Sequence, residues 1–218
     1  MGAFLMLLSK MMKSKEYHDG LTEFLGCRID LSKKPMHPRP ETEFWTEKAL
    51  AEIRGRSSSG GPTSVLDLFT GSGCIGIAIA THFPNVQITL ADKTDYISTL
   101  LPSNACFVKS DLFSNISGKF DFILANPPYV AEGTGVPGIM DGEPPEALYA
   151  GTDGLAVIGS FLKQAADHLD PGGQIWMEFG SEQKEAITNL LREFNYYQNG
   201  NCTFHKDQHG KWRYLVIN

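Results

Sequence analysis

The sequence predicts an α/β protein: a doubly wound, mostly parallel sheet of seven strands that ends in an antiparallel hairpin. Two observations predict this fold class. Short apolar runs of strand length alternate with longer helical segments from residue 63 onward, and the last two apolar runs enclose a turn-rich segment, Lys206 to Lys211. At 218 residues, of which 42% are hydrophobic, the chain is long enough to bury one sizeable core.

Each expected element follows from the local residue pattern. A linker-like stretch rich in Ser and Gly, Arg56 to Pro62, precedes the patterned region, and acidic residues at Glu41 and Glu43 favour a helix running through Trp45 to Ile53. Apolar runs bounded by turn residues predict strands at Ser64–Phe69, Val86–Ala91, Ala105–Lys109, Phe120–Ala125, Gln174–Phe179, Thr203–His205 and Arg213–Ile217. Helices are expected at Cys74–Phe83, Thr94–Leu101, Ser181–Phe194 and Thr152–Leu169, the last ended by Asp170-Pro171-Gly172-Gly173.

This pattern divides the chain into two regions. Residues 1–62 are expected to form a short helical or extended N-terminal segment and a linker, and residues 63–218 the α/β domain. The opening Met1 to Met12 is apolar, but it is too short to span a bilayer and no basic region precedes it. We therefore expect an amphipathic helix there rather than a secretory signal, and a role in organelle targeting stays open.

Charge and cysteine content narrow the class of protein. A formal charge of -6 with a pI near 5.5 argues against broad binding to a phosphate backbone, so no stable nucleic-acid complex is expected. The four cysteines are scattered, which predicts reduced thiols and neither a disulfide framework nor a zinc site. We expect a monomeric, metal-free protein of the cytoplasm, with an organelle matrix as the alternative, and no membrane association.

The most informative motif is Asn126-Pro127-Pro128-Tyr129, which directly follows the expected buried strand Phe120–Ala125. An Asn side chain offers a C=O acceptor, and rigid prolines can aim a backbone carbonyl at the same point. Two acceptors suit a planar NH2 group, and Tyr129 supplies a flat face for it. The motif predicts group transfer to an amide or exocyclic amine nitrogen, whereas the alternative is simple turn punctuation.

A glycine-rich loop, Gly71-Ser72-Gly73-Cys74-Ile75-Gly76, joins the first strong strand to a helix. The G-x-G-x-x-G spacing is weak evidence alone, but this context favours a nucleotide-type ligand, because Gly71 and Gly73 allow a tight turn and close approach. Asp92 closes the second strand twenty-one positions after Gly71, where a carboxylate can accept from both ribose hydroxyls. A nucleoside-bearing ligand is therefore expected.

The acidic residues around this loop distinguish between ligands. NAD enzymes use the same loop geometry, but Asp67 places a carboxylate where a ligand ammonium group can pair with it, and S-adenosylmethionine carries one there whereas a dinucleotide does not. Asp111, after the third strand, can accept from an adenine amine, although a turn or helix-capping role is the simpler alternative. We therefore expect S-adenosyl-L-methionine as the cofactor and S-adenosyl-L-homocysteine as its product.

With these residues in place, the chain resembles the HemK/PrmC family of S-adenosylmethionine-dependent protein-glutamine methyltransferases over roughly residues 24 to 217. The resemblance implies a class I methyltransferase-like, Rossmann-like fold. Family members methylate the side-chain nitrogen (N5) of the glutamine in the Gly-Gly-Gln loop of peptide chain release factors. The marks of the family in this sequence are Pro38-Arg39-Pro40-Glu41-Thr42-Glu43, the glycine loop with Asp67, Asn126-Pro127-Pro128-Tyr129, Glu143-Pro144, Gly151-Thr152-Asp153-Gly154-Leu155, and Glu178-Phe179-Gly180 with Gln183.

The resemblance also implies roles for individual residues. Asn126 and the Pro127 carbonyl would hold the glutamine amide, and Tyr129 would line its pocket with Pro128. Independently of the resemblance, Arg39 is expected to contact the substrate backbone or the cofactor, with a structural ion pair as the alternative. Glu178 would orient the Asn-Pro-Pro-Tyr loop or merely end its strand. The residues expected at the cofactor are Thr42, Asp67, Phe69, Thr70, Gly71, Gly73, Asp92, Asp111, Leu112 and Asn126.

The sequence departs from the family pattern at three places. Phe69 stands where the family usually has Gly, which puts the cofactor affinity in doubt. The connection from Asp92 to Asp111 is short and contains Pro102, so its helix is expected to be truncated. The N-terminal helical domain that helps grip the release factor is reduced to about twenty residues, which affects partner recognition.

Two rival functions stay open on the sequence alone. An adenine-N6 or cytosine-N4 methyltransferase acting on nucleic acid can use the same four-residue loop with Tyr129 stacked on the base. The acidic charge and the absence of sequence for a separate recognition domain disfavour this reading. The second rival is a non-catalytic protein or cofactor-binding partner subunit, for which Phe69 leaves room.

Overall fold

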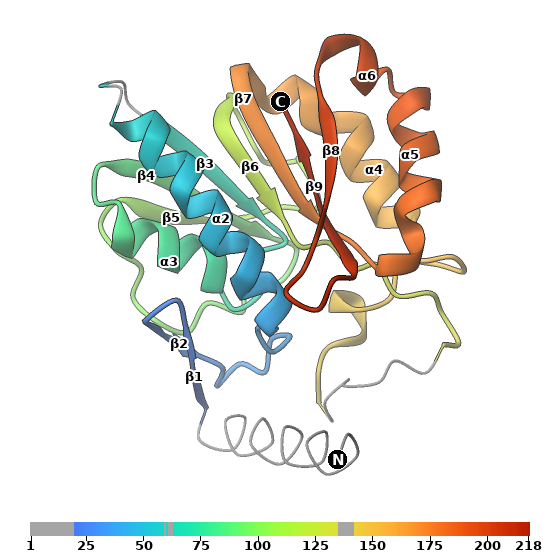
Figure 1. The fold of residues 1–218 in the computed structure, drawn as a ribbon. Helices are drawn as coiled ribbons and strands as arrows, with labels where there is room; N and C mark the ends of the chain where they lie inside the picture. Colours follow the sequence, from blue (N-terminus) through green and yellow to red (C-terminus); the bar gives the residue numbers. More distant parts are fainter. Residues whose placement is uncertain (1–19, 59, 61–62, 135–141) are drawn as a thin grey trace.

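The protein is built around one seven-stranded sheet covered by helices on both faces (Figure 1). The structure is a computed structural model that describes residues 20–58, 60, 63–134 and 142–218. The strand order is β5-β4-β3-β6-β7-β9-β8, parallel from β5 to β7 and antiparallel at β9 and β8, so the predicted fold class is confirmed. The strands are β3 (Thr63–Leu68), β4 (Val86–Asp92), β5 (Ala105–Lys109), β6 (Phe120–Ala125), β7 (Leu169–Glu178), β8 (Cys202–Lys206) and β9 (Trp212–Ile217).

The helices form two layers, one on each face of the sheet. Period-two alternation along each strand sends neighbouring side chains to opposite faces, and two separate buried clusters result. Val65 faces the cluster under α2 and α3, whereas Leu66 faces the cluster under α4 and α5. The helices are α2 (Pro40–Ser57), α3 (Cys74–His82), α4 (Ala156–Ala165), α5 (Lys184–Glu193) and α6 (Tyr196–Asn199), with 3-10 turns η1 (Pro145–Ala147), η2 (Ala166–His168) and η3 (Ser181–Gln183).

The strand order places the candidate site. The chain runs outward from β3 through β4 to β5 and then returns to pair β6 with β3, so the order reverses between β3 and β6. Ligands of open α/β sheets bind at the carboxyl ends of strands beside such a reversal. Both the glycine loop after β3 and Asn126 after β6 lie at this point.

Helix α2 brings its first turn to the same edge of the sheet. Trp45, Ala49 and Ile53 are fully buried and belong to the cluster that also contains residues of β3, β4 and β6. This burial anchors the helix and thereby positions Thr42, which is also buried, beside the end of β7. Residues before position 63 therefore contribute to the core of the sheet.

The expected helix over Thr94–Leu101 is wrong, because this segment has no helix in the structure. Asp92 Oδ1 accepts from the Thr94 N–H and Asp95 Oδ1 accepts from the Ile97 N–H, and such local side-chain bonds compete with helical ones. Lys33 Nζ donates to the Ile97 carbonyl at 2.6 Å, which engages an acceptor that a helix would use.

The helix expected over Thr152–Leu169 is shorter than predicted. Gly151 and Gly154 have φ of +78° and +74°, which are incompatible with a helix, so α4 begins at Ala156. The expected terminating turn 170–173 instead belongs to β7, where an irregular register with β6 accommodates it.

An antiparallel hairpin that we did not predict precedes α2. It consists of β1 (Leu21–Phe24) and β2 (Cys27–Asp30), joined by a tight turn in which Leu25 and Gly26 both have positive φ. The helix expected for the first residues of the chain lies outside the described residues. Within the described ranges, no helix combines the length and hydropathy needed to traverse a lipid bilayer.

Candidate active site

A cavity of ≈ 440 Å³ opens at the carboxyl ends of β3, β4 and β6. Its size is that of a small-molecule site. Many of the predicted site residues line it, and Asp67, Gly73, Pro127, Tyr129 and Arg39 do not. The predicted residues in its wall are Thr42, Phe69, Thr70, Gly71, Asp92, Asp111, Leu112, Asn126 and Pro128.

The glycine loop forms one wall and is held by the carboxylate at the end of β4. Gly71 N donates to Asp92 Oδ2 at 2.9 Å, and Asp92 Oδ1 accepts from the Thr94 N–H at 3.1 Å. Burial raises the pKa of Asp92 above its usual value, although these hydrogen bonds oppose the rise. Gly73 has φ of +82°, which L side chains rarely adopt, and a Cβ there would lie 2.7 Å from Ile97 Cδ1, so this position favours glycine.

Asp67 lies behind the loop and is completely buried. Its Oδ2 accepts from Thr70 Oγ1 at 2.5 Å and from Gly76 N at 2.8 Å, whereas its Oδ1 has no hydrogen-bond partner among the described residues. Burial raises the pKa of this carboxyl to about 7. The carboxylate thus reaches the cavity through the Thr70 hydroxyl, and it retains one unsatisfied oxygen.

Two lining residues hold strained backbone conformations. Phe69 has φ of +64° and Leu112 has φ of +51°, a left-handed region that side chains with a Cβ adopt at a cost. The Phe69 ring packs edge-on against Phe161, with ring centroids 6.1 Å apart, which offsets part of that cost. Phe69, which stands where the family usually has Gly, therefore occupies a position at which the backbone conformation favours glycine.

The far end of the cavity carries an exposed ion pair. Asp111 Oδ2 lies 3.1 Å from Lys93 Nζ, and both side chains are largely exposed. Such a pair contributes little to stability. The Asp111 carboxylate is therefore free to exchange Lys93 for a ligand donor at little cost.

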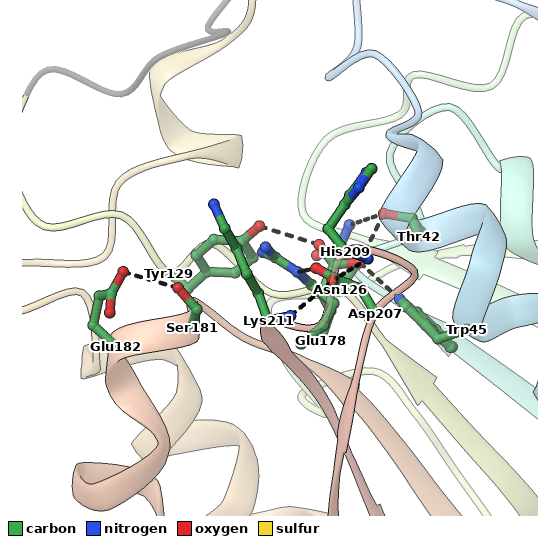
Figure 2. A network of polar contacts seen from close by, with 11 residues as sticks. Thr42, Trp45, Asn126, Tyr129, Glu178, Ser181, Glu182, Asp207, His209 and Lys211 are labelled. Atoms are coloured by element: carbon green, nitrogen blue, oxygen red, sulfur yellow. Dashed lines mark hydrogen bonds and ion pairs between the residues drawn. The ribbon is translucent and has the colours of Figure 1, made fainter.

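On the opposite wall, the Asn126 side chain belongs to a chain of hydrogen bonds that leads into the core (Figure 2). Asn126 Nδ2 donates to Thr42 Oγ1 at 3.4 Å, and Thr42 Oγ1 donates to Glu178 Oε2 at 2.7 Å. The structure therefore brings together residues of α2, β7 and the Asn-Pro-Pro-Tyr loop.

Glu178 is the centre of this network. Trp45 Nε1 donates to its Oε2 at 2.7 Å, and the Tyr129 hydroxyl donates to its Oε1 at 3.1 Å (Figure 2). The residue is only 1% exposed. Burial raises the pKa of Glu178, and the hydrogen bonds from Trp45, Thr42 and Tyr129 oppose that rise. Tyr129 thus contacts the core through its hydroxyl.

A second set of contacts holds the backbone of the Asn-Pro-Pro-Tyr loop. Gln183 Nε2 donates to the Tyr129 carbonyl at 2.9 Å and to the Gly154 carbonyl at 3.2 Å. Val130 N also donates to Leu148 O at 2.8 Å. The sequence analysis assigned no role to Gln183 or Gly154. The only feature of the sequence that could have indicated one is that both residues belong to the family motifs.

Arg39 lies outside the cavity wall in an ion pair. Its Nη2 donates to Glu143 Oε2 at 2.7 Å, and the Glu143 side chain is completely buried. Glu143 Oε1 also accepts from the His37 N–H at 2.9 Å. Glu143 therefore links the segment before α2 to the segment that follows the Asn-Pro-Pro-Tyr loop. The structural ion pair considered for Arg39 is present, and contact of Arg39 with substrate stays a prediction.

Comparison with known proteins finds methyltransferases. A family model described as "Methyltransferase small domain" matches residues 56–141. The release factor glutamine methyltransferase of Streptococcus pneumoniae is 33% identical over 215 residues, which cover 94% of this chain and 75% of that protein. A 4-amino-L-phenylalanine/4-methylamino-L-phenylalanine methyltransferase of Streptomyces pristinaespiralis is 32% identical over 185 residues, which cover 79% of this chain and 63% of that protein.

A solved structure shares the fold. The release factor-specific protein-(glutamine-N5) methyltransferase of Alicyclobacillus acidocaldarius superposes with a TM-score of 0.52 at 21% identity, over 83% of this chain and 92% of that one. The resemblance inferred from the motifs is confirmed by the sequence match to the S. pneumoniae protein, which is well above the identity at which only a fold is shared. This chain therefore belongs to the family of release factor glutamine methyltransferases.

Proposed function

We propose that this protein transfers a methyl group from S-adenosyl-L-methionine to the side-chain amide nitrogen (N5) of a glutamine in the Gly-Gly-Gln loop of a peptide chain release factor. The observation that carries the proposal is the Asn126 amide. Its Nδ2 is bound to Thr42 and its side chain lies in the wall of the cavity, so its carbonyl oxygen is the polar atom left for a substrate N–H.

The cavity residues fit this cofactor. Asp67 lies behind the cavity wall and contacts it through the Thr70 hydroxyl, and one of its buried oxygens has no hydrogen-bond partner among the described residues, which suits a nearby ligand ammonium group. Asp92 lines the cavity beside the glycine loop, where its carboxylate can accept from ribose hydroxyls, and Asp111 lies at the exposed end, where it can accept from an adenine amine. When bound, S-adenosyl-L-methionine supplies an electrophilic methyl group on a positively charged sulfur.

The chain's own residues would act on the glutamine amide. An amide nitrogen is a weak nucleophile because its lone pair is delocalised into the carbonyl. The Asn126 side-chain oxygen and the Pro127 carbonyl would accept from its two N–H groups, which moves electron density onto nitrogen and stabilises the transition state. Pro128 lines the cavity and the Tyr129 ring is held beside it, so they would align the amide and exclude water.

A methylation assay with competing acceptors tests this function. The purified chain would be incubated with labelled S-adenosyl-L-methionine and a release factor, and the Gly-Gly-Gln peptide would be examined by mass spectrometry. We expect one methyl group on the glutamine and none on a release factor whose loop glutamine is replaced by alanine. If the wild-type chain leaves this glutamine unmodified, the proposal is wrong.

Parallel arms separate the other substrate classes. Free 4-amino-L-phenylalanine tests the chemistry named for the Streptomyces relative, and single-stranded DNA and RNA test the nucleic-acid reading. Label on the free amino acid or on nucleic acid, with none on protein, would assign the same loop to an arylamine or a base. The net charge of -6 favours the protein acceptor over nucleic acid.

We infer further that the enzyme works as a monomer in a reducing compartment, most simply the cytoplasm. All four cysteines are unpaired thiols, as expected for a protein kept reduced. The division into residues 1–62 and 63–218 stays a prediction, as does recognition of the release factor with a short N-terminal segment. Light scattering of the purified chain measures the oligomeric state directly.

A further inference from the structure

We propose that Glu178 and Thr42 are positioning residues that set which end of the Asn126 side-chain amide faces the substrate. This inference rests on the proposed transfer to an amide nitrogen, for which an acceptor and not a donor must face the substrate N–H groups. Neither residue needs to touch the reacting atoms for this role.

The hydrogen-bond inventory leads to one amide orientation. The Thr42 hydroxyl has a single proton, and its oxygen lies 2.7 Å from Glu178 Oε2, so this proton is donated to the carboxylate. The Thr42 oxygen can then only accept, and of the two ends of the Asn126 amide only Nδ2 can donate to it, across 3.4 Å. If the Asn126 amide were flipped, its Oδ1 would face the Thr42 oxygen, and neither atom would have a proton to donate to the other. Oδ1 is therefore directed away from Thr42.

Trp45 supports the direction of the Thr42 proton. Its indole N–H can only donate, and it donates to the same Glu178 oxygen at 2.7 Å. That oxygen consequently offers lone pairs, and the Thr42 hydroxyl completes its coordination. Glu178 is only 1% exposed, so bulk solvent does not compete with these donors.

The identity of the donors argues against a purely strand-ending role. Glu178 is the last residue of β7, and Met177 pairs with Ala125, so its side chain stands beside Asn126 on the neighbouring strand end. Its three donors come from α2 and from the Asn-Pro-Pro-Tyr loop, and none comes from β7 itself. One carboxylate thus fixes the Tyr129 ring and, through Thr42, the Asn126 amide.

The test compares Thr42→Val with Thr42→Ser in the full chain. Valine has nearly the shape of threonine but cannot accept from Asn126, so kcat for the release factor should fall on the order of tenfold. Because Thr42 also lines the cavity expected to hold the cofactor, kcat is measured at saturating S-adenosyl-L-methionine, where a change in cofactor affinity does not lower it. Serine keeps the hydroxyl and should restore most of the turnover.

Thr46→Val is the matched control. Thr46 is buried one turn further along α2, and its hydroxyl donates to the Thr42 carbonyl at 2.8 Å rather than to Asn126 or Glu178. It should lower the melting temperature much as Thr42→Val does and leave kcat unchanged. Equal losses of kcat in the two variants would show that only helix stability matters, and would overturn the inference.

A double-mutant cycle shows whether Thr42 acts through Asn126. In an Asn126→Ala background, Thr42→Val should have no further effect on kcat, because there is no amide left to orient. Glu178→Gln provides a second probe: its amide oxygen can still accept from Thr42 and Trp45, so it should be far more active than Glu178→Leu. Additive losses in the cycle would overturn the inference while the proposed function stands. A wild-type chain that methylates no release factor would overturn both.

Discussion

Gly154 faces the carbonyl group of Tyr129 so closely that no side chain fits: a Cβ at position 154 would lie 2.2 Å from the Tyr129 oxygen and 2.9 Å from Gln183 Nε2. Its φ of +74° is also one that L side chains rarely adopt. The loop that carries the proposed amide contacts is therefore held in place by a glycine from a different segment.

We expect Gly154→Ala to displace this loop and to lower turnover by at least about tenfold, because small displacements of positioned groups are costly in rate. Gly210→Ala is the matched control, since Gly210 has φ of +76° but nothing within 4 Å of the added Cβ. Both variants should lose about 1 kcal/mol of stability to left-handed strain, and Gly154→Ala should lose more because its Cβ also meets the Tyr129 backbone. Only Gly154→Ala should lose activity, and equal activities would contradict the role of the close contact.

Phe69 carries the cost of a left-handed backbone, so replacing it should separate the contribution of its ring from that strain. Phe69→Ala removes the packing against Phe161 and keeps the strain, whereas Phe69→Gly removes both. In urea unfolding, the glycine variant should therefore be more stable than the alanine variant by about 1 kcal/mol.

The opposite order is expected at Phe107, a partly buried residue of β5 with an ordinary strand conformation. There glycine should be less stable than alanine, since it has more conformational freedom to lose on folding. The same order at both positions would mean that the Phe69 backbone is not strained.

The proposed cofactor and acceptor sites are predictable from sequence because both are strand-end motifs. The apolar run Phe120–Ala125 indicates a buried parallel strand, and the glycine loop follows another, so both must reach the same edge of one sheet. This argument needs only local pattern and the handedness of strand connections. It brings Asn126, Gly71 and Asp92 to one edge of the sheet, where all three lie in the wall of one cavity.

The network behind Asn126 is not predictable in this way. Thr42 and Glu178 are 136 residues apart, and their contact depends on how α2 packs over the sheet. In the sequence alone, Glu178 is equally compatible with a residue that merely ends its strand and with one that orients the Asn-Pro-Pro-Tyr loop. The helix prediction for residues 94–101 was wrong for a related reason. Lys33, which is distant in sequence, donates to the carbonyl of Ile97 and helps to hold this segment in an irregular conformation.

Asn126→Ala should separate turnover from cofactor binding. Removing the side-chain acceptor is expected to lower kcat by about 10²-fold or more, as for deletion of one preorganised polar group at a transition state, with cofactor affinity retained. Asp92→Ala is the reciprocal control, because loss of its carboxylate should weaken cofactor binding measured by calorimetry. Wild-type-like turnover in Asn126→Ala would refute the acceptor role, and unchanged affinity in Asp92→Ala would refute the ribose role.

The Asp67 carboxyl should make folding stability depend on pH. Burial raises its pKa in the folded protein from 3.8 to about 7. Below about pH 4 the group is protonated whether the chain is folded or unfolded, and its full contribution to stability is present. As the pH rises toward 7 the unfolded chain ionises first, so stability falls by up to about 1.4 kcal/mol per pH unit, and the fall ends above the folded pKa.

Asp67→Asn removes this titration while its amide oxygen can still accept from Thr70 and Gly76. The gain in stability of the variant over wild type, from urea unfolding, should therefore grow between about pH 4 and pH 7 and then level off. A ligand ammonium group would favour the ionised carboxylate, so binding of S-adenosyl-L-methionine near pH 7 should release protons in wild type and fewer in the variant. Calorimetry in buffers of different ionisation enthalpy measures this release. Parallel stability profiles would show that Asp67 titrates alike in the folded and unfolded chain.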